Sequence, residues 1–270
     1  MSTNPAFEPT LLSRIEDAGI NASAPPQQRW VDGWLVRFSP GKAKRARCIN
    51  AVAAGRLPVN GKLALCEPIF REAGLPLHVR VTPFSLPPQL DAQLAALGLR
   101  RQDDTRVMVR ASLHDLPESS VPRGTRLGRL GHHAFAELVG NLRGSTLAER
   151  QAHGERLALS PVPFHGFSLT NEDGVVVSCG QIAIEGELAG LYDVYTAASH
   201  RGCGYAGALC LEALHFSREQ GAIVGYLQVD AENGAVRRLY GRLGFCDAYG
   251  YHYRTQDAPP VAVAPGEDRL

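Results

Sequence analysis

Residues 194–214 read VYTAASHRGCGYAGALCLEAL, and this stretch decides the fold. An apolar run ends at Thr196, a short loop carries Gly202 and Gly204, and a helical pattern begins near Tyr205. Two glycines at such a junction can serve a tight turn that needs positive φ, or let the backbone approach a ligand closely. The unpaired N–H groups and the dipole of a helix start favour an anion. We therefore expect a strand, a phosphate-binding loop and a helix.

The patterns on both sides of this loop predict a mixed α/β protein. Between residues 125 and 196 the pattern predicts a strand, two helices and then a hairpin followed by a third long strand. Beyond the loop helix it predicts a strand, a helix and a strand. The expected ranges are strands at 125–130, 164–170, 175–185, 188–196, 222–229 and 246–254, and helices at 132–143, 145–159, 205–220 and 233–243.

The first part of the chain shows a similar order of elements. The expected ranges are helices at 8–20, 60–73 and 87–98, and strands at 33–39, 44–52, 77–83 and 105–110. Leu97-Gly98-Leu99 leads into a strand that ends at Arg110, and Leu243-Gly244-Phe245 leads into one that ends at Arg254. This likeness indicates an internal repeat.

The polar, proline-bearing segment 111–124 predicts a domain boundary. We expect a first domain over 1–112, a second over 124–256 and a disordered tail over 257–270. When the repeats are aligned, Leu94 and Pro87 stand where the second copy has Tyr240 and Asn233. The counterpart of the glycine loop, AAGRLPVNGK, lacks the paired glycines. The first copy is therefore expected to be degenerate, without a ligand site of its own.

Gly202, Gly204 and Gly207 also fit G-x-G-x-x-G, and Asp230 stands near the position of a ribose-binding acid. A dinucleotide-dependent oxidoreductase is thus a competing interpretation. Five residues separate Thr196 from the first glycine, however, and too little chain follows for a six-stranded dinucleotide-binding sheet.

The sequence resembles the GNAT acyltransferase superfamily at these residues. Arg201-Gly202-Cys203-Gly204-Tyr205-Ala206 matches the signature R/Q-x-x-G-x-G/A, and LYDVYT (191–196) and LQVDAENGAVRRLYGRLGF (227–245) resemble the family's flanking elements. The resemblance implies a mixed sheet between helices, with the fourth strand splayed from the fifth. It also implies acetyl-CoA as the cosubstrate, with its pantetheine arm in that gap.

The resemblance also implies roles for individual residues. Backbone groups of the fourth strand would pair with pantetheine, and N–H groups of the loop would hold pyrophosphate. Asn233 would contact the cofactor, and Tyr240 would protonate the leaving thiolate. The implied cofactor-binding residues are Val194, Tyr195, Thr196, Arg201, Gly202, Cys203, Gly204, Tyr205, Ala206 and Asn233.

The proton acceptor is less determined. Members of the family often carry a glutamate on the fourth strand, where this chain has Tyr192. Asp193 follows it, and alternation along a strand turns its side chain away unless a bulge brings it round. A water chain is a third possibility.

Composition excludes several classes of function. The formal net charge is +1, so no broad attraction to nucleic acid or to a membrane is expected. Six scattered cysteines without a signal peptide indicate reduced thiols and a cytoplasmic protein. His132, His133 and His165 lack metal-ligand spacing, and no metal is expected. The basic run from Lys42 to Arg47 favours a solvated strand edge, with contact to an acidic substrate as the alternative.

The sequence therefore predicts an acetyl-CoA-dependent N-acetyltransferase, active as a monomer or homodimer, that acts by direct transfer on a small-molecule or peptide amine. A non-catalytic acyl-CoA-binding regulatory module is the alternative from another class. No motif in the sequence indicates which amine is the acceptor.

Overall fold

The computed structural model describes residues 3–39, 43–118 and 121–256. The tail predicted over 257–270 lies outside the described residues, as does Lys42. Within these ranges, eleven strands form one mixed sheet in the order β1-β2-β3-β4-β11-β5-β10-β9-β8-β7-β6. The strands are β1 (Gln28–Val31), β2 (Trp34–Arg37), β3 (Ile49–Asn50), β4 (His78–Val81), β5 (Arg100–Arg110), β6 (Thr125–Leu130), β7 (Phe164–Asn171), β8 (Val176–Glu185), β9 (Leu188–Thr196), β10 (Val224–Asp230) and β11 (Cys246–Thr255).

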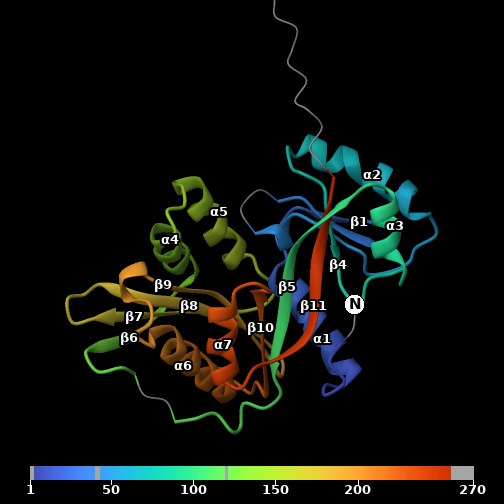
Figure 1. The fold of residues 1–270 in the computed structure, drawn as a ribbon. Coiled ribbons are helices and arrows are strands. Elements are labelled where there is room, and N and C mark those ends of the chain that lie inside the picture. Colours follow the sequence, from blue (N-terminus) through green and yellow to red (C-terminus); the bar gives the residue numbers. More distant parts are fainter. Residues whose placement is uncertain (1–2, 40–42, 119–120, 257–270) are drawn as a thin grey trace, which may run out of the picture.

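Helices lie on both faces of this sheet, which confirms the predicted fold class (Figure 1). The α-helices are α1 (Pro9–Ala22), α2 (Val59–Glu72), α3 (Leu90–Ala96), α4 (His132–Leu142), α5 (Leu147–Ala158), α6 (Tyr205–Glu219) and α7 (Gly234–Arg242). Two short 3-10 turns, η1 (Lys44–Ala46) and η2 (Ala198–His200), lie in loops.

The order of elements confirms the internal repeat. The series β1-β2-β3-α2-β4-α3-β5 is followed, after β6, α4 and α5, by β7-β8-β9-α6-β10-α7-β11. Pairing agrees as well, because β3 and β4 are parallel, β9 and β10 are parallel, and the hairpins before them are antiparallel.

The last strand of each copy crosses into the other copy. β5 pairs with β10 of the second copy, and β11 pairs with β4 of the first. The two exchanged strands also pair with each other, antiparallel, at the centre of the sheet (Figure 1). The boundary expected between residues 112 and 124 remains a prediction, since the sheet runs through both copies without a break.

Two expectations for the first copy are wrong. Residues 28–31 form a strand that was not expected, joined to β2 by Asp32 and Gly33, whose φ angles are 42° and 85°. Positive φ at both turn positions is typical of a type I′ hairpin, and the Asp-Gly pair was its signal. The strand expected over 44–52 shrinks to β3, because η1 turns the chain so that Arg45 points into the protein.

Each face of the sheet has its own apolar core. Under α6 and α7 the core includes Leu209, Leu214, Leu227 and Phe245. On the other face α1 packs Leu12 and Ile15 against the central strands, and α4 and α5 bury Phe135 and Leu157 over β7. These helices fix the two strands that border the glycine loop, β9 and β10.

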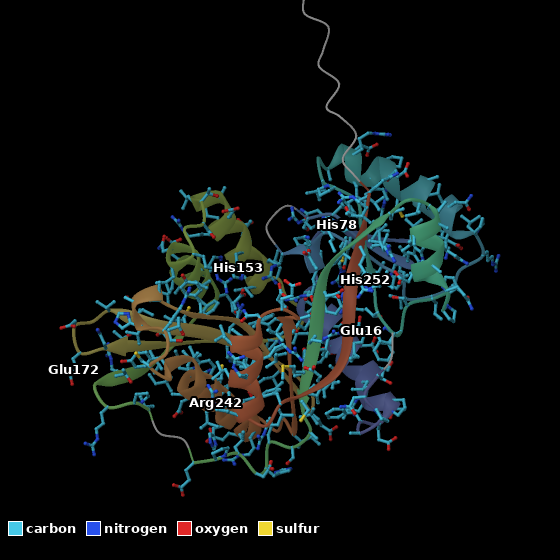
Figure 2. The ribbon with its side chains drawn as sticks, viewed as in Figure 1. Glu16, His78, His153, Glu172, Arg242 and His252 are labelled. Carbon is cyan, nitrogen blue, oxygen red and sulfur yellow. The ribbon has the colours of Figure 1, made fainter. Side chains whose placement is uncertain are left out.

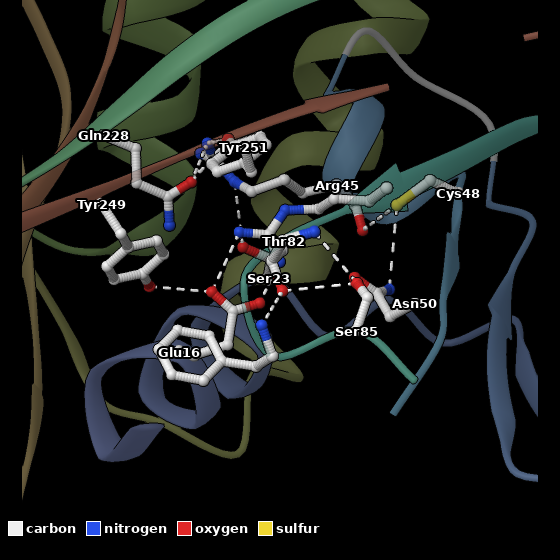
Figure 3. Close-up of polar contacts among 12 residues, drawn as sticks. Glu16, Ser23, Arg45, Cys48, Asn50, Thr82, Ser85, Gln228, Tyr249 and Tyr251 are labelled. Atoms are coloured by element: carbon white, nitrogen blue, oxygen red, sulfur yellow. Dashed lines mark hydrogen bonds and ion pairs between the residues drawn. The ribbon is translucent and has the colours of Figure 1, made fainter. Parts of the chain in front are cut away.

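A buried polar cluster holds α1 to the strands of both copies (Figure 3). Glu16 on α1 forms an ion pair with Arg80 on β4, and their side chains are 8% and 3% exposed. The Tyr249 hydroxyl on β11 donates to Glu16 Oε2 at 2.8 Å, and the Arg80 guanidinium lies 3.9 Å from the centre of the Tyr251 ring. Removal of one partner from such a pair leaves an uncompensated buried charge.

We predict that Glu16→Leu lowers the free energy of unfolding by about 3–5 kcal/mol, because Arg80 stays buried without its partner. Urea unfolding at neutral pH measures this. The matched control is Arg14→Ala, which removes the exposed ion pair from α1 to Glu187 and should cost about 1 kcal/mol or less. The double variant Glu16→Leu/Arg80→Met should regain most of the loss. Equal effects of Glu16→Leu and Arg14→Ala would contradict the importance of the buried pair.

Candidate functional site

The loop between β9 and α6 has the predicted geometry. Gly202 and Gly204 have φ angles of 80° and 83°, and α6 begins at Tyr205 without a side-chain cap. A Cβ atom at either glycine would meet no protein atom within 4 Å. The Ala208 N–H donates to the Gly204 carbonyl, whereas the N–H groups before it belong to the unpaired first turn. The turn therefore presents open backbone donors beside the positive end of a helix.

A gap opens between β9 and β10 next to this loop. Their parallel pairing runs from Leu188 and Val224 to Leu191 and Leu227, and β9 then leaves its neighbour. This is the splay expected between the fourth and fifth strands of the second copy. A bulge marks the departure, because Gln181 of β8 pairs with Tyr192 whereas Cys179 pairs with Tyr195.

The bulge decides where the side chains of β9 point. Asp193 has a φ of 51°, and its carboxylate accepts hydrogen bonds from Gln181 Nε2 at 2.7 Å and Arg143 Nη1 at 2.8 Å. It thus faces α4 and α5, on the same side as Tyr192. Val194–Thr196 stays paired with β8, and its other edge borders the gap.

The second copy places Tyr240 and Asn233 on α7. Asn233 caps the helix, accepting a hydrogen bond from the Val236 N–H at 3.2 Å. Tyr240 is 6% exposed, with its ring 5.9 Å from that of Phe245. Burial raises the pKa of Tyr240, so the phenol is protonated at neutral pH. Within the described ranges its hydroxyl has no hydrogen-bond partner.

The two candidate proton acceptors differ in charge. The Tyr192 hydroxyl lies 3.1 Å from that of Tyr226, and burial raises the pKa of Tyr192, which is therefore neutral. Burial by itself would raise the pKa of Asp193 too, but the contacts with His153 and Arg143 outweigh it and hold this pKa well below its usual range. Asp193 is thus ionised and a weak base.

A cleft of about 450 Å³ opens on this side of the sheet. It lies between α4 and α5 of the second copy and the loop around η1 of the first, and Asp193 lies in its wall. Its charged and imidazole side chains are Arg45, Arg143, Glu149, His153, Glu155, Arg156 and Asp193. The expectation of a solvated edge for the basic run is wrong for Arg45, which donates to Gln228 Oε1 at 2.8 Å.

Sequence reasoning missed His153. It lies on α5, above the sheet, with Nε2 3.4 Å from Asp193 Oδ2 (Figure 2). No spacing in the sequence links it to Asp193, because the contact depends on the bulge in β9 and on the packing of α5.

In the first copy, the side-chain carboxylate of Asp32 binds the backbone N–H groups of the loop that corresponds to the glycine loop. Asp32, in the turn between β1 and β2, accepts hydrogen bonds from the N–H groups of Arg56 and Leu57 at 3.0 and 2.8 Å. The Nζ atom of Lys62, a fully buried side chain, lies 3.3 Å from the same carboxylate. The hydrogen bonds from Leu57 and Arg56 lower the pKa of Asp32, so a fixed negative charge occupies this position.

The part of the chain that the structure describes has neither a membrane-spanning helix nor a candidate metal site. Within residues 3–39, 43–118 and 121–256, none of the helices is long and apolar enough to span a membrane. The same ranges contain no group of three or more His, Cys, Asp or Glu side chains that could hold a metal ion. All six cysteines are free thiols.

The comparisons with known proteins agree with one another, since both the family model and the curated relative are acetyltransferases. Residues 136–245 match the family described as acetyltransferase (GNAT) family. The chain is 24% identical over 234 residues to the Uncharacterized N-acetyltransferase YobR of Bacillus subtilis (strain 168), covering 84% of this chain and 91% of that protein. Neither an oxidoreductase nor a silent binding module finds support in these matches.

Solved structures show the same fold. A GCN5-related N-acetyltransferase from Kribbella flavida superposes with a TM-score of 0.65 at 17% identity, over 93% of this chain and 97% of that chain. A tandem GNAT protein from the clavulanic acid biosynthesis pathway gives 0.61 at 18% identity, over 74% and 70%. The family match over residues 136–245, the curated relative and these shared folds together support a place for the chain in the GNAT superfamily.

Proposed function

We propose that the protein transfers an acetyl group from acetyl-CoA to a primary amine of a small molecule or a peptide. The observation that carries this proposal is the gap between β9 and β10, which ends at an open glycine turn on the N-terminus of α6. Release of CoA in the presence of a panel of amines tests it. Absence of CoA release with every amine would contradict the proposal.

The described residues fit acetyl-CoA. The free edge of Val194–Thr196 has the backbone groups to pair with the pantetheine arm, and the N–H groups of Arg201–Ala206 can bind pyrophosphate. Asn233 uses its side-chain oxygen as the cap of α7, which leaves its amide N–H groups for the same ligand. When bound, acetyl-CoA supplies an activated thioester.

Tyr240 is the proposed proton donor to the leaving sulfur. A thiol has an ordinary pKa of about 8.5 and a phenol of about 10, and burial raises that of Tyr240 further. The hydroxyl therefore carries its proton at neutral pH and, within the described ranges, shares it with no protein group. Its place in the core under α6 and α7 holds the ring in one orientation.

The attacking amine must lose its proton, and we propose that Asp193 and His153 act together in this. Asp193 is too weak a base to accept the proton itself, but its carboxylate faces Nε2 of the His153 imidazole. An imidazole oriented in this way can accept a proton on its other nitrogen. Tyr192, neutral and bonded to Tyr226, would shape the site without taking the proton.

The first copy is proposed to bind no acetyl-CoA. Asp32 occupies the N–H groups that would otherwise bind phosphate, and a second anion there would meet its charge. Leu94, the counterpart of Tyr240, is fully buried in the core of that copy. The chain should therefore carry one cofactor site.

We predict that Gly204→Val weakens acetyl-CoA binding at least ~10-fold, or about 1.4 kcal/mol, because the side chain would project into the open turn at a φ of 83°. Calorimetry measures the affinity and should give one site per wild-type chain. Gly174→Val is the matched control, since Gly174 has a φ of 78° and open space in a turn of the β7–β8 hairpin. Unchanged affinity in Gly204→Val, or two equivalent sites per chain, would overturn the assignment.

Tyr240→Phe is expected to lower kcat by about 10²-fold with little change in acetyl-CoA affinity, because it removes the proton and keeps the ring. Single-turnover kinetics at neutral pH isolates the chemical step. Tyr249→Phe removes the hydroxyl that donates to Glu16, and this control should retain the wild-type rate. If kcat of Tyr240→Phe equals that of the wild type, Tyr240 has a packing role only.

His153→Gln should lower kcat/KM by about 10²-fold, because it removes the proposed proton acceptor. Glutamine keeps a donor to Asp193 but accepts no proton from the amine. The control is His215→Gln, because His215 contacts the Pro117 carbonyl on an exposed part of α6. A His153→Gln variant with the kcat/KM of the wild type would show that another group takes the proton.

A further inference from the structure

The cleft has Asp193 in its wall, close to the point along β9 where this strand separates from β10. Asp193 lies two residues beyond Leu191, the last residue of β9 that pairs with β10. Gln228 follows Leu227, the last paired residue of β10, and binds Arg45 from the first copy. If acetyl-CoA lies in the gap, as proposed above, this cleft is where an acceptor would reach the thioester.

Three arginines line the cleft, and their partners differ. Arg143 is paired with Asp193 at 2.8 Å. Arg45 is held by neutral groups, with Nη1 2.8 Å from Gln228 Oε1 and Nε 3.3 Å from Ser23 Oγ, and it also lies beside the Tyr251 hydroxyl (Figure 3). This network fixes the guanidinium of Arg45 without neutralising its charge.

Arg156 has a different environment. Among the described residues it has no hydrogen bond and no ion pair, although it lies within electrostatic range of Asp193, Arg45 and Tyr192. Burial lowers the pKa of Arg156, which reports the cost of placing this charge away from water. A guanidinium in such a position offers its planar set of donors to a ligand.

Within the described ranges, none of the acidic groups around the cleft forms an ion pair with Arg45 or Arg156. Asp193 is already paired with Arg143. Glu149 accepts a hydrogen bond from the Thr146 N–H in the capping box of α5, and Glu155 is exposed at the rim. The cleft thus combines an ion-paired carboxylate beside His153 with two arginines, Arg45 and Arg156, that form no ion pair with a described residue.

We propose that the acceptor is an amine that also carries an anionic group, a carboxylate or a phosphate, and that Arg156 and Arg45 bind that group. Arginine binds both anions through paired, charge-assisted hydrogen bonds. His153 and Arg156 are three residues apart on α5, so their Cβ atoms are about 5–6 Å apart on one side of the helix. The amine would reach His153 and Asp193 while the anionic group rests on Arg156. This inference rests on the proposed acetyl transfer.

The test compares matched acceptors in the wild-type protein and in Arg156→Gln. The panel pairs α-amino acids with their α-amino amides, and aminoalkyl phosphates with the corresponding amino alcohols. The wild type should prefer the anionic member of a pair by about 10- to 100-fold in kcat/KM. Arg156→Gln should lose that preference, with kcat/KM for the neutral member within twofold of the wild type. Arg156→Lys keeps the charge without the paired donors and should be intermediate.

A binding experiment separates this inference from the proposed reaction. Calorimetry with the N-acetylated amino acids as probes should show binding to the wild type and to Arg242→Gln, an exposed arginine on α7 (Figure 2), and at least ~10-fold weaker binding to Arg156→Gln. Binding without turnover of any amine would overturn the acetyl transfer and support the anion site. Equal use of both members of each pair, unchanged in Arg156→Gln, would overturn the anion site alone. Neither turnover nor binding would overturn both.

Discussion

The antiparallel pairing of β5 with β11 at the centre of the sheet is the constraint on which the rest of the structure depends. Because each of these strands comes from one copy and also pairs with a strand of the other, backbone hydrogen bonds of a single sheet join the two copies. The ion pair of Glu16 with Arg80 lies against these central strands. Together with the hydrogen bond from Tyr249 of β11 to Glu16, it holds α1 on one face of the sheet. The relative position of the copies, and with it the wall of the cleft that carries Arg45, follows from strand pairing.

The two copies differ in whether the loop before the helix is open. Both have a strand, a loop and a helix in the same order, and in both the loop places backbone N–H groups before the helix. In the second copy these groups are open, and in the first Asp32 occupies them. Lys62 balances the carboxylate from inside the core. The architecture is therefore common to both copies, and a few residues placed on it decide whether the turn is open.

Much of this fold could be predicted from the sequence because its signals are local. The glycines before α6, the asparagine cap of α7 and the Leu-Gly ends of α3 and α7 each set the backbone within a few residues. The splay between β9 and β10 was implied by the resemblance to the GNAT superfamily, and the strand pairing confirms it. The hairpin of β1 and β2 also had a local signal, Asp32-Gly33, which was overlooked.

The cleft could not be predicted in this way, because Arg45, His153, Arg156 and Asp193 meet only through tertiary structure. Arg45 binds Gln228 across the junction of the copies, and the periodicity of a helix or a strand cannot predict that contact. The bulge at Asp193 depends on a shift of register between β8 and β9, and the sequence pattern of one strand does not reveal such a shift. Residues that meet only across such a junction have no characteristic spacing in the sequence by which they could be recognised.

The exchange of strands also bears on the order in which the protein can form during synthesis. β4 emerges from the ribosome with the first copy, but one of its two neighbours, β11, is made only after the whole second copy. Until then β4 has an open edge, and β5 lacks both of its partners, β10 and β11. Open strand edges pair readily with other chains, and long-range pairing forms slowly. The partners that β4 and β5 have in the finished sheet are thus complete only after translation has passed β11.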